Sequence, residues 1–196
     1  MTLTSKMILV LTVLTMISGG LLSYWDGFTR PKIEAYRLEQ LKKAIAEVLP
    51  AYEHYDEIQG DGMTLYVGKN SDNPRPVGIA FEAIGNGFQG KISIMVGMNA
   101  DFNKINAIKI LEQVETPGLG TKIVDDPSNK TDEFWFSNQF KNLTVEPEIT
   151  VIKNTKPVNP NEIQAITGAT LSSNAVTKIL NDNIKKAKSI YLSKVQ

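Results

Sequence analysis

Residues 77–98 read VGIAFEAIGNGFQGKISIMVGM and predict two antiparallel strands. In the first run, apolar residues alternate with smaller or polar ones at Val77, Ile79, Phe81 and Ala83. In the second run, 90–98, the same alternation places Ile92, Ile94 and Val96 on one side. A period of two is typical of a strand with one buried face. Gly85-Asn86-Gly87 joins the two runs as a hairpin loop, in which these residue types supply positive φ.

Further alternating runs extend this hairpin into an antiparallel sheet. They are 63–67 and 105–111, the latter after a turn at 99–101. Residues 149–152 predict a last strand. The aromatic-rich segment 134–140 predicts a short helix that covers the sheet, and 157–160 predicts a loop. A C-terminal helix is predicted by apolar residues at helical spacing, which are Val176, Ile179, Leu180, Ile184, Ala187 and Tyr191. The expected fold class is α+β, a mainly antiparallel sheet with one buried face and flanking helices.

The N-terminal segment predicts a single transmembrane helix. Residues 7–25 carry no charge, and a rise of ~1.5 Å per residue gives them a length of about 28 Å, close to the hydrocarbon thickness of a bilayer. Tyr24 and Trp25 lie where an interfacial aromatic belt is expected. A cleaved signal peptide is the alternative, although no A-x-A site follows the apolar run. A second helix is expected to open at Thr29-Arg30-Pro31 and to end at Pro50.

These boundaries divide the chain into a transmembrane anchor at 1–25, a linking or stalk helix at 26–50 and one domain at 51–196. With a short N-terminus in the cytoplasm, the domain lies on the extracytoplasmic side of the cell membrane. His54 is expected to be exposed in a loop after the stalk helix. Asp125, Asp126 and Glu133 are expected in a solvated acidic loop, because they lack the spacing of a calcium site.

Composition limits the chemistry that the chain can perform. Its 196 residues include 21 basic and 21 acidic side chains, so it lacks the positive charge that nucleic-acid binding needs. The absence of cysteine excludes disulfides, zinc–thiolate sites and iron–sulfur clusters held by the chain itself. With a single histidine as well, no metal site is expected. Any redox chemistry must therefore come from a cofactor that needs no thiolate ligand.

The segment Ile166-Thr167-Gly168-Ala169-Thr170-Leu171-Ser172-Ser173 lies immediately before the C-terminal helix. Small residues here allow close approach to the backbone, and the unpaired amides of a first helical turn favour an anion. Hydroxyl groups at 170, 172 and 173 lie at the same place, so a phosphate is a suitable occupant and a neighbouring hydroxyl can be esterified by it. The alternative is a plain helix cap, since Ser and Thr are common capping residues.

Thr167-Gly168-Ala169-Thr170 resembles the flavin-attachment motif of the FMN-binding domain family, in which the last threonine is joined to the FMN phosphate. Glu115-Thr116-Pro117-Gly118-Leu119-Gly120 resembles a second motif of the same family, in the same order and at a similar separation. A histidine that often precedes this motif is replaced here by Gln113 and Val114. The resemblance implies FMN joined covalently to Thr170. The other implied cofactor-binding residues are Thr167, Gly168, Ala169, Leu171, Ser172, Ser173, Glu115, Thr116, Gly118, Leu119 and Gly120.

Two motifs after one membrane helix resemble the G subunits of Rnf-type ion-translocating complexes, which transfer electrons between ferredoxin and NAD. The resemblance implies an electron-transfer subunit without substrate turnover of its own. Its implied partners are the other Rnf subunits, a flavin transferase and the bilayer around residues 7–25, with no nucleic acid. The C subunits of sodium-pumping NADH:quinone oxidoreductases are near relatives and the first alternative. A tethered module that binds a free phosphorylated ligand and a purely structural subunit are the others.

Overall fold

The computed structural model describes residues 2–195, apart from the side chains of Pro74 and Val195. Within it, the chain forms two compact units, Met1–Gln40 and Leu41–Gln196. The first unit consists of most of helix α1 (Leu3–Val48), whose apolar part is long enough to cross a membrane and has no buried residue. The predicted N-terminal helix is therefore present.

The predicted start of a second helix at Thr29 is wrong, because α1 continues through Pro31. Proline removes only one backbone hydrogen bond, and the bonds on either side persist. The turn before it is held by the Thr29 hydroxyl, which donates to the Trp25 carbonyl (2.9 Å), and by the Arg30–Asp26 ion pair (2.6 Å). These contacts keep the helix continuous where the sequence suggested a new start.

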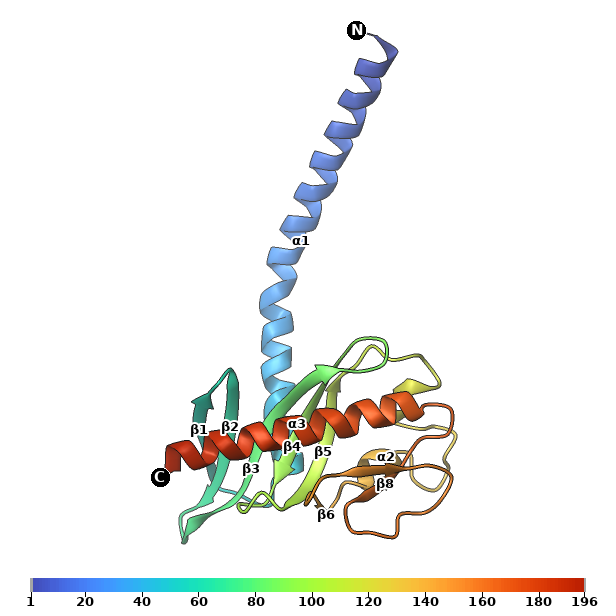
Figure 1. The fold of residues 1–196 in the computed structure, drawn as a ribbon. Helices are drawn as coiled ribbons and strands as arrows, with labels where there is room; N and C mark the ends of the chain where they lie inside the picture. Colours follow the sequence, from blue (N-terminus) through green and yellow to red (C-terminus); the bar gives the residue numbers. More distant parts are fainter. Residues whose placement is uncertain (1, 196) are drawn as a thin grey trace. The chain divides into compact units, whose positions relative to one another are not determined.

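The second unit is built on a six-stranded sheet in which strands follow one another in chain order and all pairs are antiparallel. The strands are β1 (His54–Gly60), β2 (Met63–Asn70), β3 (Asn73–Asn86), β4 (Lys91–Met98), β5 (Lys104–Glu112) and β6 (Leu143–Thr144) (Figure 1). The predicted meander is confirmed. His54, expected in a loop, is instead the exposed first residue of β1, an edge strand that the sequence analysis missed.

The predicted loop conformation at 85–87 is wrong. Gly85 and Asn86 belong to β3, and none of the three residues has positive φ; the turn is closed by Gly87 N–H donating to the Gly90 carbonyl (2.6 Å). Gly85 serves packing instead, because a Cβ there would lie 2.5 Å from Cγ1 of Ile179. The positive-φ hairpin turn is Asp61-Gly62, between β1 and β2.

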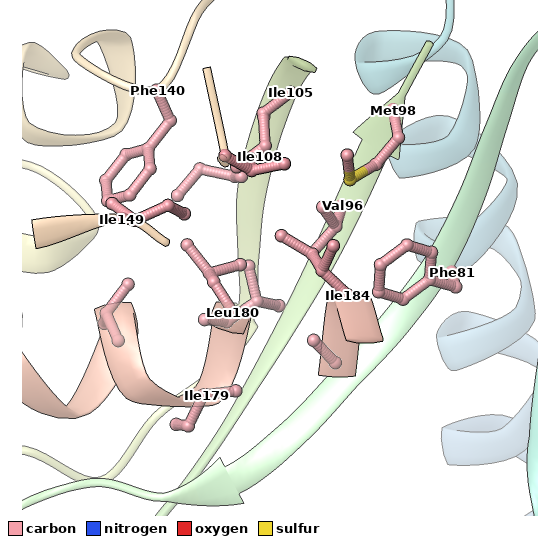
Figure 2. Packing of buried hydrophobic residues seen from close by; sticks show 14 of the residues in the cluster. Phe81, Val96, Met98, Ile105, Ile108, Phe140, Ile149, Ile179, Leu180 and Ile184 are labelled. Atoms are coloured by element: carbon pink, nitrogen blue, oxygen red, sulfur yellow. The ribbon is translucent and has the colours of Figure 1, made fainter. Parts of the chain in front are cut away.

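Both faces of the sheet are buried, where the sequence predicted only one. One face packs against helix α3 (Thr170–Val195), which lies across it, and against the short helix α2 (Trp135–Asn138) (Figures 1 and 2). Its core includes Phe81, Val96, Met98, Phe140, Leu180 and Ile184. The other face packs against the last turns of α1, and this second cluster consists of Ala44, Ile45, Val48, Leu49, Tyr66, Ala80 and Met95. Seven successive residues of β4 are therefore buried.

Smaller elements lie between β5 and α3. They are a short 3-10 helix η1 (Gly120–Ile123), α2, and a parallel pair of strands, β7 (Thr150–Ile152) and β8 (Glu162–Gln164). The predicted short helix near 134–140, the loop at 157–160 and the C-terminal helix are confirmed. The strand at 149–152 is also present, but it is not the last, because β8 follows it.

Gly97→Ala is expected to destabilise the second unit by about 2 kcal/mol, the cost of overpacking a filled core. A Cβ at Gly97 would collide with the backbone carbonyl of Val48, so the end of α1 must shift away from the sheet. Urea unfolding of the detergent-solubilised protein measures the change. Gln59→Ala, on the exposed edge strand β1, is the control and should stay within about 0.5 kcal/mol of the parent chain.

Candidate functional site

The N-terminus of α3 is built from a tight turn over residues 166–169. Gly168 has φ of 83°, and Ala169 N–H donates to the Ile166 carbonyl (3.0 Å), as in a type II turn. The buried Ser173 fixes this turn to the helix, since its Oγ accepts from Ile166 N–H (3.0 Å) and donates to the Ala169 carbonyl (3.1 Å). The turn before the helix is thus held by Ser173, not by Thr170.

Thr170 opens the helix with its hydrogen-bonding groups free. Within residues 2–195, neither its hydroxyl nor its backbone N–H has a hydrogen-bond partner. The N–H groups of Leu171 and Ser172 are also unpaired within this described part of the chain. Three amides at the positive end of a helix and one free hydroxyl suit a phosphate group.

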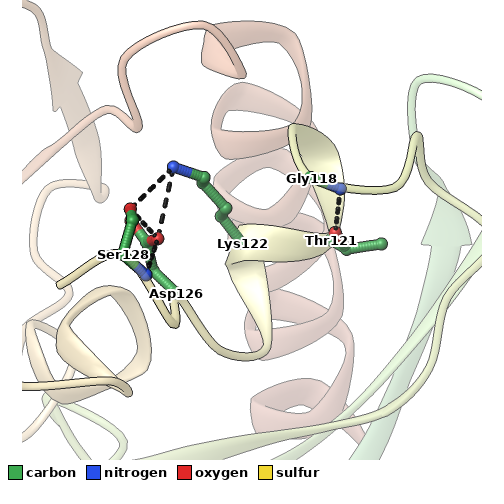
Figure 3. Close-up of polar contacts among 5 residues, drawn as sticks. All are labelled: Gly118, Thr121, Lys122, Asp126 and Ser128. Carbon is green, nitrogen blue, oxygen red and sulfur yellow. Dashed lines mark hydrogen bonds and ion pairs between the residues drawn. The ribbon is translucent and has the colours of Figure 1, made fainter.

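The second motif forms another turn of the same type. Gly118 has φ of 73°, and the Thr116 carbonyl accepts from both Leu119 N–H and Thr121 N–H, each at 3.2 Å. Gly118 N–H donates to the Thr121 hydroxyl (3.0 Å), as Figure 3 shows. The turn therefore runs directly into η1 and has a fixed shape, with Leu119 projecting from it.

Glu115 connects this turn to two other segments. Its side chain is 4% exposed. Oε1 accepts from Phe88 N–H (2.8 Å) and Gln89 N–H (3.1 Å) in the β3–β4 loop, and Oε2 accepts from Ser172 Oγ (2.5 Å) in α3. These three bonds join the turn to the β3–β4 loop and to α3, so Glu115 acts as a structural link between the three segments.

Two glycines let the motifs touch although about fifty residues separate them. A Cβ at Gly120 would lie 2.7 Å from Glu115 Cβ and 2.8 Å from Ser172 Oγ. A Cβ at Gly168 would lie 3.4 Å from Cδ2 of Leu119. The structure thus brings the two sequence motifs together at one end of α3.

Exposed apolar side chains accompany this junction. The exposed fractions are 58% for Phe88, 62% for Val114, 48% for Leu119 and 57% for Leu171. Large apolar side chains left in water at one place mark a binding surface. The sequence predicts a role for the two leucines but none for Phe88, Gln89 or Val114. An aromatic residue in a glycine-rich loop was the available signal for Phe88.

Asp126 lies in the segment that follows η1. The sequence predicted a solvated carboxylate here, and that prediction is wrong. Asp126 is buried, and its Oδ1 accepts from Ser128 Oγ (2.5 Å) and Ser128 N–H (3.1 Å) and pairs with Lys122 Nζ (3.2 Å) (Figure 3). The Ser128 hydroxyl and then Lys122 hold the pKa of the Asp126 carboxyl below its usual value. Glu133, by contrast, is exposed as predicted.

Acidification should loosen the segment 120–128. Because the pKa of Asp126 is lower in the folded state, its contribution to stability is present above the ordinary carboxyl pKa of about 4 and is lost as the pH falls through the lowered value. Hydrogen exchange of the backbone amides of 120–128, corrected for intrinsic rates, should show a loss of protection as the pH falls from 7 to 3. Asp126→Asn should remove it; an unchanged transition in that variant would assign it to other groups.

Comparison with family models matches residues 87–185 to the FMN-binding domain, which is just over half of the chain. The chain belongs to the FMN-binding domain family. The matched region begins at the β3–β4 loop that Glu115 holds and contains both turns and most of α3. The junction of the two turns is therefore part of the FMN-binding domain.

Relatives of similar length cover nearly the whole chain. It is 29% identical over 187 residues to the G subunit of the ion-translocating oxidoreductase complex of Methanosarcina acetivorans, with 92% of each chain covered. It is 28% identical over 197 aligned positions to the G subunit of the Na⁺-translocating ferredoxin:NAD⁺ oxidoreductase complex of Acetobacterium woodii, covering 92% of this chain and 89% of that one. With its one apolar N-terminal helix, the protein is a membrane-anchored member of the family.

Solved structures share the fold. Shewanella oneidensis NqrC superimposes with a TM-score of 0.51 at 18% identity, over 69% of this chain and 65% of that one. The C subunit of the Na⁺-translocating NADH-quinone reductase from Parabacteroides distasonis gives a TM-score of 0.51 at 23% identity, over 74% and 78%. The predicted α+β fold with an antiparallel sheet is confirmed.

Proposed function

We propose that the chain carries FMN as a phosphoester on Thr170 and relays electrons within an Rnf-type ion-translocating oxidoreductase complex. The observation that carries the proposal is the free Thr170 hydroxyl beside the three free amides of residues 170–172. Membership of the FMN-binding domain family and similarity to G subunits of such complexes support it.

The residues at the junction suit the parts of FMN. The amides of 170–172 would hold the phosphate, because a helix N-terminus favours an anion. Leu119 and Leu171 would offer apolar contact to the ring, with Phe88 and Val114 beside them, and the Thr116 hydroxyl would reach a polar edge. When bound, FMN supplies a centre that exchanges electrons singly or in pairs. The chain itself would hold the ring, exclude water and keep the Pro-Gly-Leu-Gly turn rigid through Glu115.

Maturation would require a flavin transferase that uses FAD and magnesium. The bond between Thr170 Oγ and phosphorus would form as the pyrophosphate of FAD breaks, and AMP would leave while the hydroxyl loses its proton. Nothing in the geometry of the junction supplies a base for this step, since Glu115 is occupied by Phe88, Gln89 and Ser172. The separate enzyme would provide it.

The chain would act with the other membrane and peripheral subunits of its complex, anchored in the bilayer by residues 7–25. We place the domain on the extracytoplasmic side, where covalent attachment would prevent loss of the flavin. The stalk would be 26–50, with its last turns packed against the sheet, and the flavin domain would be 51–196. The name of the Acetobacterium relative describes transfer between ferredoxin and NAD⁺ coupled to Na⁺. For this complex we propose the same transfer of electrons between ferredoxin and NAD⁺, coupled to Na⁺ or protons. The chain alone would turn over no substrate.

The intact mass of protein purified from its own membrane tests the covalent bond, because one FMN phosphoester should be added and fluorescence should survive denaturation. A flavin-free mass, from cells that contain the transferase, would refute it. A module that binds a free phosphorylated ligand would lose that ligand on unfolding. Co-purified subunits test the complex: ferredoxin-linked partners support the proposal, whereas quinone-linked partners would indicate the NADH:quinone oxidoreductase that the NqrC fold allows.

A further inference from the structure

One edge of β5 has no strand partner over most of its length. β5 pairs with β4 through six residue pairs, but β6 covers only Lys104 and Ile105. Within the described part of the chain, the backbone of residues 106–111 makes no hydrogen bond on the side away from β4. In an antiparallel pair, alternate residues direct N–H and C=O groups outward. Six residues at ~3.3 Å each therefore offer an open edge of about 20 Å.

A groove lies along this open edge. One cavity of about 370 Å³ is lined by the consecutive residues 107–110, and a second of about 610 Å³ by 110–114. Consecutive residues of a strand point to opposite faces, so a cavity that contacts all of them lies at the strand's edge. The two cavities share Ile110 and Val124 and therefore adjoin at these residues; together they are called the groove here. Its far wall is formed by Phe134, Ser137 and Asn138 around α2.

The two outer edges of the sheet differ in their protection. β1 places exposed charges at Asp56 and Glu57, a usual means of preventing strand addition. β5 carries Ile108 and Ile110, which are nearly buried, and its one lysine in this stretch, Lys109, is paired with Glu47 of α1 (2.5 Å). The edge of β5 is therefore apolar and able to accept another strand.

The charges at the ends of the groove indicate what kind of segment fits. Lys141 lies at the end next to α2 and Lys91 at the end next to Val114, and both are exposed. Within the described residues, neither lysine has a salt-bridge partner. The lining also carries Glu112 beside Lys91, and Glu47 with Lys109 near α2, so only the α2 end has an excess of positive charge. An occupant with alternating apolar residues and an acidic residue at the end near Lys141 would complement the groove.

We propose that an extended segment of another subunit adds to the sheet as a strand along residues 106–111. Main-chain hydrogen bonds would supply its affinity, and the apolar wall and Lys141 would supply its selectivity. The inference rests on the proposed function, since the partner is a subunit of the same complex. After β5 ends at Glu112, the chain runs through Gln113 and Val114 to Glu115, so a strand bound here would hold its subunit beside the turn that contains Gly118.

Hydrogen exchange tests the proposal with the purified complex and with the isolated full-length chain in the same detergent. Outward amides of 106–111 should exchange at least tenfold more slowly in the complex, whereas the exposed edge of β1 should be unchanged. Equal exchange in both samples overturns the docking. A chain that never purifies with other subunits overturns both this inference and the complex, whereas a flavin-bearing complex with an unprotected β5 overturns the docking alone.

Single-cysteine variants identify the occupant, because the natural chain has no cysteine. In the assembled complex, Lys141→Cys carrying a short photo-crosslinker should join to another subunit, while Gln59→Cys on β1 should not. A cross-link to a second copy of this chain, or none from Lys141→Cys, overturns the proposal. FMN content, measured on both variants, should match that of the natural chain and shows that the fold is intact.

Discussion

Thr170→Val is expected to abolish covalent flavin attachment, leaving an intact mass equal to that of the bare polypeptide. Valine keeps the shape of the side chain but lacks the oxygen that would form the ester. The Thr170 hydroxyl makes no hydrogen bond within the described residues, so its loss should leave the free energy of unfolding nearly unchanged. Mass spectrometry and in-gel fluorescence after denaturation measure the result in cells that contain the transferase.

Thr167→Val is the matched control for this experiment. Thr167 lies in the same turn and is exposed, but the residue at the start of the helix is Thr170. The control should retain the flavin adduct on most molecules. Attachment that persists in Thr170→Val, or that disappears only in Thr167→Val, would show that the ester is formed elsewhere in the turn.

The sequence predicts those strands and helices whose apolar residues recur at a regular spacing. β3, β4, β5 and α3 each carry a clear period, and the structure contains all four. β1 was missed because its residues, His-Tyr-Asp-Glu-Ile-Gln-Gly, are mostly polar at an exposed edge, so no apolar face marks it. Its following Asp-Gly pair, a strong hairpin signal, was the sign that a strand precedes β2.

The second buried face of the sheet could not be predicted, because the residues that cover it are distant in the sequence. Met95 and Ala80 interrupt the expected alternation by being apolar on the supposed outer face, and they pack against Ala44, Ile45 and Val48 at the end of α1. A helix assigned to a stalk gave no reason to expect such contact. Only the tertiary arrangement shows that residues 41–48 belong to the domain's packing.

The candidate site was predictable as two turns but not as one junction. Each turn has its own sequence signature, with glycine where φ is positive, at Gly118 and Gly168. Their contact depends on Glu115, whose partners Phe88 and Gln89 offer backbone N–H groups that carry no residue-specific signal. Hydrogen bonds from a side chain to a distant backbone are therefore the part that the sequence could not provide.

Glu115→Ala is expected to lower the free energy of unfolding by about 4.5 kcal/mol, because three hydrogen bonds to a charged group are lost and each is worth at least roughly 1.5 kcal/mol. It should also reduce FMN attachment, since the β3–β4 loop and the start of α3 lose their common link. Urea unfolding of the detergent-solubilised protein, together with flavin content per chain, measures both effects.

Glu115→Gln separates this bracing role from the charge. The amide oxygen of the glutamine can still accept from Phe88 N–H and Gln89 N–H, and its amide NH₂ group can donate to Ser172 Oγ. The loss of unfolding free energy should therefore fall to about 1 kcal/mol, and flavin content should recover. Ser172→Ala removes only the third bond to the carboxylate and should cost about 1.5 kcal/mol. If Glu115→Gln were as damaging as Glu115→Ala, the carboxylate would have to act through its charge, and the junction would be held by electrostatics instead of by hydrogen-bond geometry.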